Sequence, residues 1–179
     1  MGKDRSSDDF AAFVDAVGPR LHNFATMIAA DGHDGEDLLQ TALERIWVRW
    51  QSRPPSEPYA YARQVVLNAQ RSRMRLRLNK SEFPMDFADS VDESASKDVG
   101  LEWEDAALDR DVLRSSLRAL SPHQRNVVVL RYLEDLAVAD VAEILCCSVG
   151  SVKKNSHIGL QRLRVEIARA GVVAQDCEV

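Results

Sequence analysis

An acidic stretch over residues 81–105 divides the chain and limits how it can fold. Residues 81–106 carry nine acidic side chains against Lys97 alone, whereas residues 56–80 carry six basic side chains against Glu57 alone. The start of the acidic stretch is also rich in serine, contains proline and lacks helical periodicity. Because like charges repel, such a segment stays extended. The sequence therefore predicts a flexible acidic linker between two small domains. The expected divisions are a first domain at residues 1–80, the linker at 81–105, a second domain at 106–170 and a short tail at 171–179.

Both domains are expected to be helical. Ala, Leu, Arg, Glu and Asp dominate the sequence, only 6% of it is aromatic, and Val and Ile form no alternating strand-like runs. No apolar stretch approaches the roughly 20 residues that a transmembrane helix needs, and the charged N-terminus lacks the apolar segment of a secretion signal. The predicted fold class is therefore all-α, in a cytoplasmic protein without membrane insertion.

The chain carries no recognisable catalytic or metal-binding pattern. Its three cysteines cannot all pair within one chain, and the adjacent Cys146 and Cys147 lack the spacing of a zinc site. No glycine-rich phosphate loop, Ser/His/Asp set or paired-carboxylate pattern is present. We therefore expect no enzyme activity, no metal and no cofactor.

Three helices are predicted in the first domain. Apolar residues recur at helical spacing from Phe10 to Ile28, and a second helix is expected to start with Asp34 as its N-cap. A rigid proline-rich turn then precedes a third helix, which runs from about Tyr59 to Leu78.

Two surfaces of this domain have more than one interpretation. The second helix has a polar face that periodicity alone explains as solvent-exposed, formed by Asp37, Gln40, Thr41 and Glu44. The end of the third helix carries arginines spaced by two, which surround the helix, at positions Arg71, Arg73, Arg75 and Arg77. Their charge density favours nucleic-acid binding over a solvated helix end.

The second domain opens with a helix near Leu108–Leu120 and a strong helix-start signal. Ser121 suits the N-cap, Pro122 the first helical position and Gln124 the third, which is a capping-box arrangement. The helix that follows is expected to reach about Leu133.

The rest of this domain has the pattern of a helix-turn-helix. A helix over residues 138–145 is followed by a break at residues 146–148 and by a longer helix from Val149 to about Ala170. The first turns of the long helix carry charged and hydrogen-bonding side chains, which are Ser151, Lys153, Lys154, Asn155 and His157. Such residues at the start of a recognition helix can reach base edges and phosphates. We therefore favour DNA reading over a solvated basic face.

Taken together, these segments resemble the sigma-70 superfamily, and specifically its minimal extracytoplasmic-function (ECF) class. The resemblance covers about residues 8–170. Short motifs carry it in the family's order: residues 34–43 resemble "DxEDLxQ", residues 59–68 "aYLrrvaxN", residues 120–125 "LPxxqR", residues 129–132 "xLRy" and residues 149–153 "xGTVK". The wording of residues 37–43 is most similar to actinobacterial members.

The resemblance implies a specificity subunit of bacterial RNA polymerase with three sets of binding residues. The set implied for core polymerase is Asp37, Gln40, Thr41 and Glu44. The set implied for melting and reading the minus-ten element is Arg53, Ser56, Tyr61, Arg63, Asn68, Arg71, Arg73 and Arg75. Residues 51–58 would form the loop that captures a flipped non-template base. The set implied for the minus-thirty-five element is Arg125, Arg131, Ser151, Lys153, Lys154, Asn155 and His157.

The implied partners are core RNA polymerase, through its β′ clamp helices and β flap, and promoter DNA. An anti-sigma factor holds many family members and is a further implied partner, while the acidic linker would thread toward the RNA exit channel. Two other functions stay open on the residues alone. One is a stand-alone helix-turn-helix regulator, which leaves the first domain without a role. The other is an adaptor that binds polymerase without reading DNA.

The long helix departs from the family pattern at several positions. Cys146 stands where the family has its turn glycine, and a left-handed backbone there would be strained. Ser156 and Ile158 replace an apolar and a basic residue, and Gly159 interrupts the helix at a cost of about 1 kcal/mol relative to alanine. We therefore expect a looser reading helix.

Overall fold

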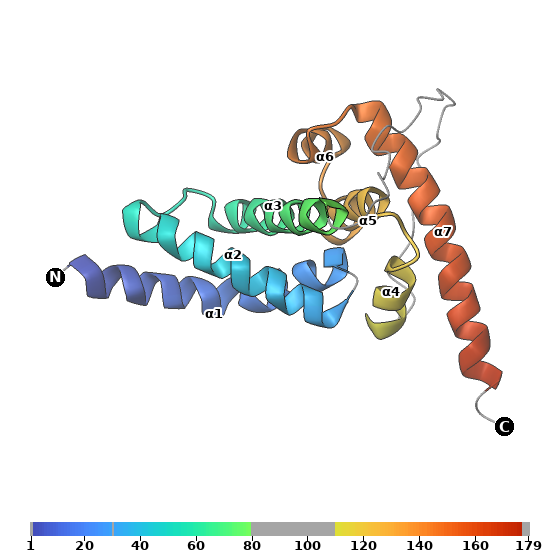
Figure 1. The fold of residues 1–179 in the computed structure, drawn as a ribbon, viewed down its shortest axis with the longest axis horizontal. Coiled ribbons are helices and arrows are strands. Elements are labelled where there is room, and N and C mark those ends of the chain that lie inside the picture. The colour runs from blue at the N-terminus through green and yellow to red at the C-terminus, as the bar shows by residue number, and fades with distance from the viewer. Residues whose placement is uncertain (1, 30, 80–109, 177–179) are drawn as a thin grey trace. The chain divides into compact units, whose positions relative to one another are not determined.

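The computed structural model describes residues 2–29, 31–79 and 110–176, and within them every regular element is a helix. The helices form two units, which residues 80–109 separate along the sequence (Figure 1). This confirms the predicted all-α fold with two small helical domains. The predicted acidic linker lies outside the described residues.

The first unit contains α1 (Gly2–Ala29), α2 (Gly32–Ser52) and α3 (Pro58–Asn79). The helix α1 continues through the exposed Pro19 without ending. The expected N-cap of α2 is wrong by three residues, because Asp31 fills that position. Asp31 has an extended backbone, and its Oδ1 accepts the backbone N–H groups of His33 at 3.0 Å and Asp34 at 3.4 Å. Asp34 instead lies in the first turn of α2.

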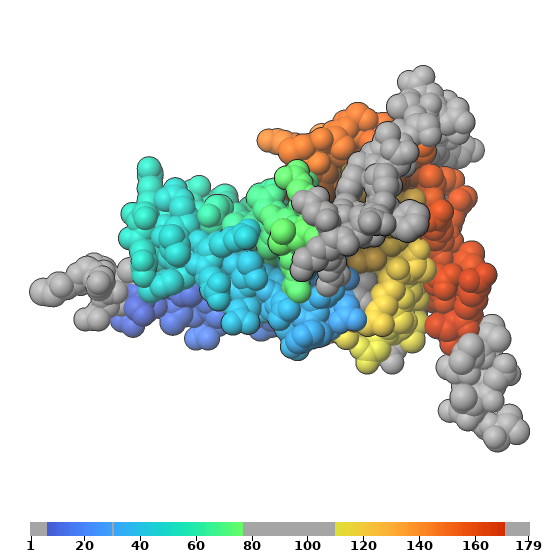
Figure 2. Space-filling view, viewed as in Figure 1, coloured from blue at the N-terminus to red at the C-terminus, as the bar shows by residue number. Residues whose placement is uncertain are grey.

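An aromatic cluster joins α1 to α2. The ring centroids of Phe10 and Trp47 are 4.9 Å apart, and those of Phe13 and Trp50 are 4.8 Å apart. At the other end of α2 the two backbones approach closely, since a Cβ added at Gly35 would lie 2.7 Å from the Cα of Thr26. The helices α2 and α3 are also in contact, and their outer side chains form one continuous surface (Figure 2).

The second unit contains two short helices and a π-helical turn before the helix-turn-helix. These elements are α4 (Arg110–Leu117), α5 (Pro122–Val128) and η1 (Val129–Leu133). The predicted capping box is confirmed: the Ser121 hydroxyl accepts the Gln124 N–H at 3.3 Å, and the Gln124 side chain accepts the Ser121 N–H at 3.4 Å. The π-helical turn changes the hydrogen-bond pattern before the expected end of the helix.

The helix-turn-helix is formed by α6 (Val138–Leu145) and α7 (Val149–Asp176). The expectation that Gly159 interrupts the long helix is wrong, because α7 is continuous through it. A Cβ at Gly159 would lie 2.7 Å from Cγ2 of Val128, so glycine permits close packing of α7 on α5. The helix also extends past Ala170, where the short tail was expected to begin.

Candidate nucleic-acid interface

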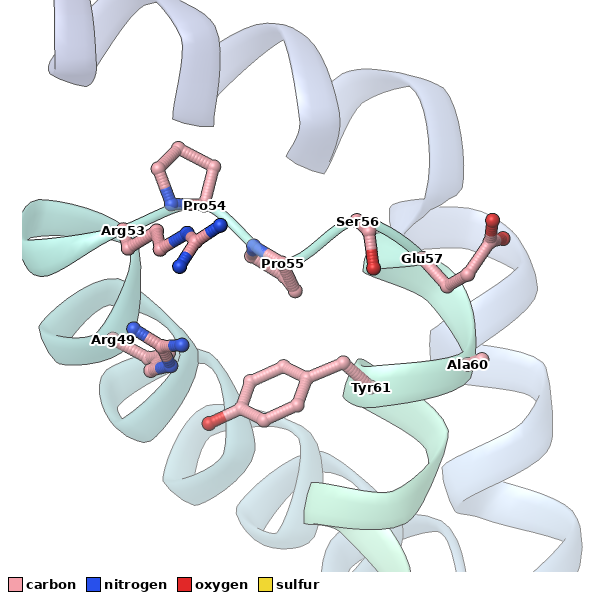
Figure 3. Close-up of a pocket in the computed structure, with 8 residues that line it drawn as sticks. All are labelled: Arg49, Arg53, Pro54, Pro55, Ser56, Glu57, Ala60 and Tyr61. Atoms are coloured by element: carbon pink, nitrogen blue, oxygen red, sulfur yellow. The ribbon is translucent and has the colours of Figure 1, made fainter.

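A hollow of about 620 Å³ opens between the end of α2 and the start of α3. Its lining residues are Arg49, Arg53, Pro54, Pro55, Ser56, Glu57, Ala60 and Tyr61 (Figure 3). The helix α2 ends where Arg53 becomes extended, at φ −162° and ψ 116°, and two prolines follow. Proline fixes its own φ and disfavours a helical conformation in the residue before it. The loop therefore keeps the two helix ends apart and the hollow open.

The groups that face this hollow are mostly hydrogen-bond donors and one aromatic ring. Figure 3 shows the guanidinium groups of Arg49 and Arg53, the hydroxyl of Ser56 and the ring of Tyr61 directed toward it, with the Glu57 carboxylate turned away. No described residue forms an ion pair with either arginine. A ring beside unpaired guanidinium groups can stack a nucleobase and hold its acceptor atoms or phosphate.

The structure brings together three residues of the predicted minus-ten set, namely Arg53, Ser56 and Tyr61. The sequence prediction missed Arg49, which lines the same hollow. Its position one helical turn before Arg53 is a signal that could have identified it.

Arg63 does not lie on the expected surface. Only 9% of it is exposed, and its guanidinium carbon lies 5.9 Å from the centroid of the Tyr59 ring. The guanidinium carbon of Arg20, on α1, lies 4.1 Å from the centroid of the same ring. In this structure Arg63 therefore belongs to the packing around Tyr59, and a guanidinium buried there would have to leave this site to reach a phosphate, so its contact with the minus-ten element stays a prediction.

The other predicted minus-ten residues lie farther along α3. Asn68 is exposed, and its Oδ1 accepts hydrogen bonds from Gln64 at 3.3 Å and Arg71 at 3.5 Å. Arg75 is exposed. Arg73 instead turns toward α2, where its guanidinium donates to the carboxylates of Asp34 at 3.2 Å and Asp37 at 3.0 Å.

The predicted polymerase-binding residues share one side of α2. Gln40 and Glu44 are exposed, and Thr41 is half-buried. The Asp37 side chain is 44% exposed although it pairs with Arg73. One turn beyond Glu44, Val48 is 66% exposed and adds an apolar group that the sequence prediction did not include.

In the second unit, the turn before α7 is left-handed at Cys146, with φ 54° and ψ 47°. Its N–H binds the Glu143 carbonyl at 3.1 Å, and the Cys147 N–H binds the Ala142 carbonyl at 3.0 Å, which satisfies the end of α6. The left-handed backbone is the condition under which strain was expected for a non-glycine residue at this position. The Ser148 hydroxyl then accepts the N–H of Ser151 at 3.0 Å at the start of α7.

Part of the predicted reading set is accessible on α7 and part is buried. Lys153 is exposed, and Ser151, Lys154 and His157 are half-buried. Asn155 is only 2% exposed, and its Nδ2 donates to the Ser151 carbonyl at 2.9 Å. Asn155 therefore belongs to the interior in this structure, and its contact with DNA stays a prediction.

Arg125 also belongs to the interior. It is 9% exposed, and its guanidinium donates to the carbonyls of Leu117 at 2.9 Å and Leu120 at 3.1 Å. Burial, and secondarily the charge of Arg118, lower the pKa of Arg125 to about 10. These contacts satisfy carbonyls at and just after the end of α4, so Arg125 serves the fold in this structure, and its contact with DNA stays a prediction.

Arg131 is half-buried beside Tyr132, and its guanidinium makes its contacts within the second unit. Its Nη1 donates to the Leu136 carbonyl, and its buried Nε has no hydrogen-bond partner among the described residues. The exposed cations of this unit therefore lie mainly on α7, where Arg162 and Arg164 follow Lys153.

The described residues contain no group of three or more His, Cys, Asp or Glu side chains that could hold a metal ion. Among them, none of the helices combines the length and the apolar character that a membrane span requires.

Comparisons with known proteins match both units. The model of sigma-70 region 2 matches residues 13–78, and the model of sigma-70 region 4 matches residues 110–163. The RNA polymerase sigma-E factor of Streptomyces coelicolor is 34% identical over 171 residues, which cover 95% of this chain and 92% of that protein. The ECF RNA polymerase sigma factor SigW of Bacillus subtilis is 25% identical, over 92% of each.

A solved structure shows a similar fold. It is the sigma factor RpoE of Bartonella quintana in complex with the anti-sigma factor NepR. The match has a TM-score of 0.62 and 24% identity, and covers 89% of this chain and 97% of that one.

Proposed function

Because this chain belongs to the sigma-70 family, as an ECF RNA polymerase sigma factor, we propose a division of its binding tasks between the two units. As a sigma factor, the chain binds core RNA polymerase and directs promoter recognition, DNA melting and transcription initiation. It supplies binding energy and positioning, and the polymerase carries out the chemistry. The observation that carries the assignment of tasks is the hollow beside Tyr61, with two arginines that no described residue pairs.

We assign core binding to the polar side of α2. Its exposed carboxylates and amide, on Asp37, Gln40 and Glu44, suit a basic and polar surface such as the β′ clamp helices. The exposed Val48 extends this surface by one helical turn.

The hollow is assigned to one unstacked base of the non-template strand at the minus-ten element. Extruding a base from the duplex costs a few kcal/mol, about as much as stacking on an aromatic side chain and hydrogen bonding can return. Tyr61 would provide the stacking surface, and Arg49, Arg53 and Ser56 would donate hydrogen bonds. Arg71 and Arg75, farther along α3, would hold the phosphate backbone.

The minus-thirty-five element is assigned to the start of α7. Ser151, Lys153, Lys154 and His157 lie at least partly on the surface of its first three turns. A helix that enters the major groove by its N-terminal end contacts base edges with these turns and phosphates with the flanking cations. The β flap is the polymerase element that we assign to this unit.

We propose a cytoplasmic location for the chain, together with core polymerase, and an anti-sigma factor as a second protein partner. The solved relative of similar fold was crystallised with such a factor. Capture of an anti-sigma factor by the purified chain, and its displacement by core polymerase, would support this partner. Failure of the chain to bind any protein other than polymerase would contradict it.

Run-off transcription from a promoter library tests the function directly. Core polymerase with the purified chain should initiate selectively from sequences that share two spaced elements and should resist heparin, whereas core polymerase alone should not. If the chain binds duplex DNA tightly without polymerase and supports no initiation, it acts as a stand-alone regulator. If it binds core polymerase without any promoter selectivity, it acts as an adaptor.

A further inference from the structure

Arg73 joins two surfaces that the proposed function assigns to different partners. It lies on α3 among the arginines assigned to DNA, yet its guanidinium reaches α2. Nη2 lies 3.0 Å from Oδ2 of Asp37 and 3.2 Å from Oδ1 of Asp34, and Nη1 donates to the Asp34 carbonyl at 3.2 Å. Both carboxylates lie in the α2 segment that resembles the family's polymerase-binding motif.

The neighbouring arginines are placed differently. Arg75 is exposed and has no ion pair with any described residue. Arg71 lies one turn away from it, with its guanidinium 3.5 Å from Oδ1 of Asn68 on the same helix. Arg73 forms an ion pair with Asp37 on α2, and the pair remains accessible, with 31% of the Arg73 side chain and 44% of the Asp37 side chain exposed.

An accessible ion pair competes with any outside charge that binds either member. When a cation of the polymerase binds Asp37, Arg73 loses one of the two carboxylates that it pairs with. When a phosphate binds Arg73, Asp37 likewise becomes available to the polymerase. Since each external ligand weakens the same internal contact, the two binding events favour each other.

We propose that the contact between Arg73 and Asp37 couples core binding to DNA binding. In the free chain it holds Arg73 on α2. When polymerase occupies Asp37, the hold on Arg73 weakens and its guanidinium turns to the promoter backbone. This inference rests on the proposed assignments of the α2 surface to polymerase and of α3 to DNA.

The first test compares Arg73→Gln with Arg75→Gln, its matched control, which removes the same charge without touching α2. The dissociation constant for core polymerase is measured with each full-length variant. Arg73→Gln should bind core about twofold to fivefold more tightly than wild type, the range of an exposed ion pair. Arg75→Gln should bind core as wild type does. Unchanged or weaker core binding by Arg73→Gln would overturn the proposal.

The second test is the salt dependence of promoter binding by the polymerase complex. Each arginine that contacts duplex phosphate contributes about 0.9 to the slope of log affinity against log salt concentration. Both variants should lower the slope by about this amount. A slope that Arg73→Gln leaves unchanged, while Arg75→Gln lowers it, would show that Arg73 stays on α2 and would overturn the proposal.

A double-mutant cycle separates coupling from simple bracing of the two helices. In an Asp37→Asn background, Arg73→Gln should no longer tighten core binding, because the competing carboxylate is gone. A bracing contact predicts instead that Arg73→Gln lowers the melting temperature and weakens core binding in the wild-type background, and does so less in the Asp37→Asn background. If wild type itself bound no core polymerase, the proposed function would fail first, and this outcome is distinct from loss of the coupling.

Discussion

The first unit offers nucleic acid a hollow of about 620 Å³ between two helix ends, whereas the second offers the protruding start of a single helix. The hollow owes its shape to a loop with two prolines, and its arginines are unpaired among the described residues. The start of α7 instead depends on a left-handed turn at Cys146 and on the buried Asn155. A hollow suits a base that has left the stack, and an exposed helix start suits an intact major groove.

The two units also differ in what their polar side chains do, because those of the first unit serve binding and those of the second unit serve folding. In the first unit most of the loop's polar groups face the hollow. In the second unit Arg125 and Asn155 are occupied by backbone carbonyls inside the domain. Substitutions in the two units should therefore differ in what they disturb, from overall stability to one binding step.

The largest effect is expected from Arg125→Ala. It removes two hydrogen bonds to buried carbonyls and leaves a cavity, so it should lower the free energy of unfolding of the second unit by about 3 kcal/mol. The first unit should retain its stability. Hydrogen exchange measured during thermal unfolding would distinguish the two units. Arg118→Ala, which changes an exposed neighbour, is the control. If the variant's second unit stayed stable and lost only DNA affinity, Arg125 would be a DNA contact and not a structural residue.

Gly35→Ala should produce the converse result. The new Cβ would lie 2.7 Å from the Thr26 Cα, so α1 and α2 must separate at a cost of about 2 kcal/mol in the stability of the first unit. Core binding should weaken while the second unit stays folded. Gly32→Ala is the matched control, since nothing lies within 4 Å of its added Cβ. Equal melting temperatures for the two variants would contradict the close approach.

The double substitution Lys153→Gln with Lys154→Gln should affect binding without unfolding. Loss of two cations at the start of α7 should weaken promoter binding by about tenfold and lower its salt slope by up to about 1.8. The melting temperature should stay within about 2 °C of wild type. Arg164→Gln, farther along the same helix, tests whether position matters. An equal loss from Arg164→Gln would argue against reading by the first turns.

Cys146→Gly should give the smallest change in stability, and this change should be a gain. Glycine adopts the φ of 54° without a Cβ penalty, so the second unit should gain about 1 kcal/mol in stability. Chemical denaturation of wild type and variant would measure it. An unchanged or lowered midpoint would show that the cysteine side chain compensates for the strain.

The sequence predicted the helices, the capping box and the two-domain division because each rests on local patterns. Ser121 and Gln124 cap within one turn, and Cys146 stands at a break that composition marks. The sites were predicted less completely, because exposure depends on packing between helices. Motif position alone does not show that Arg125 caps α4, that Asn155 bonds back to Ser151, or that Arg73 crosses to α2. Helix propensity predicted only the cost of Gly159. Its benefit, the close packing of α7 on Val128, depends on a contact between helices.

Permanganate reactivity of promoter thymines tests the division of labour most directly. In complexes with core polymerase, the wild-type chain should make thymines of the minus-ten element reactive. Tyr61→Ala should leave the promoter bound but lower this reactivity by about fivefold to 150-fold, since base stacking contributes about 1–3 kcal/mol. The variant with both Lys153→Gln and Lys154→Gln should lose binding and reactivity together. If the Tyr61→Ala variant made these thymines as reactive as the wild-type chain does, this result would contradict the capture of a base in the hollow.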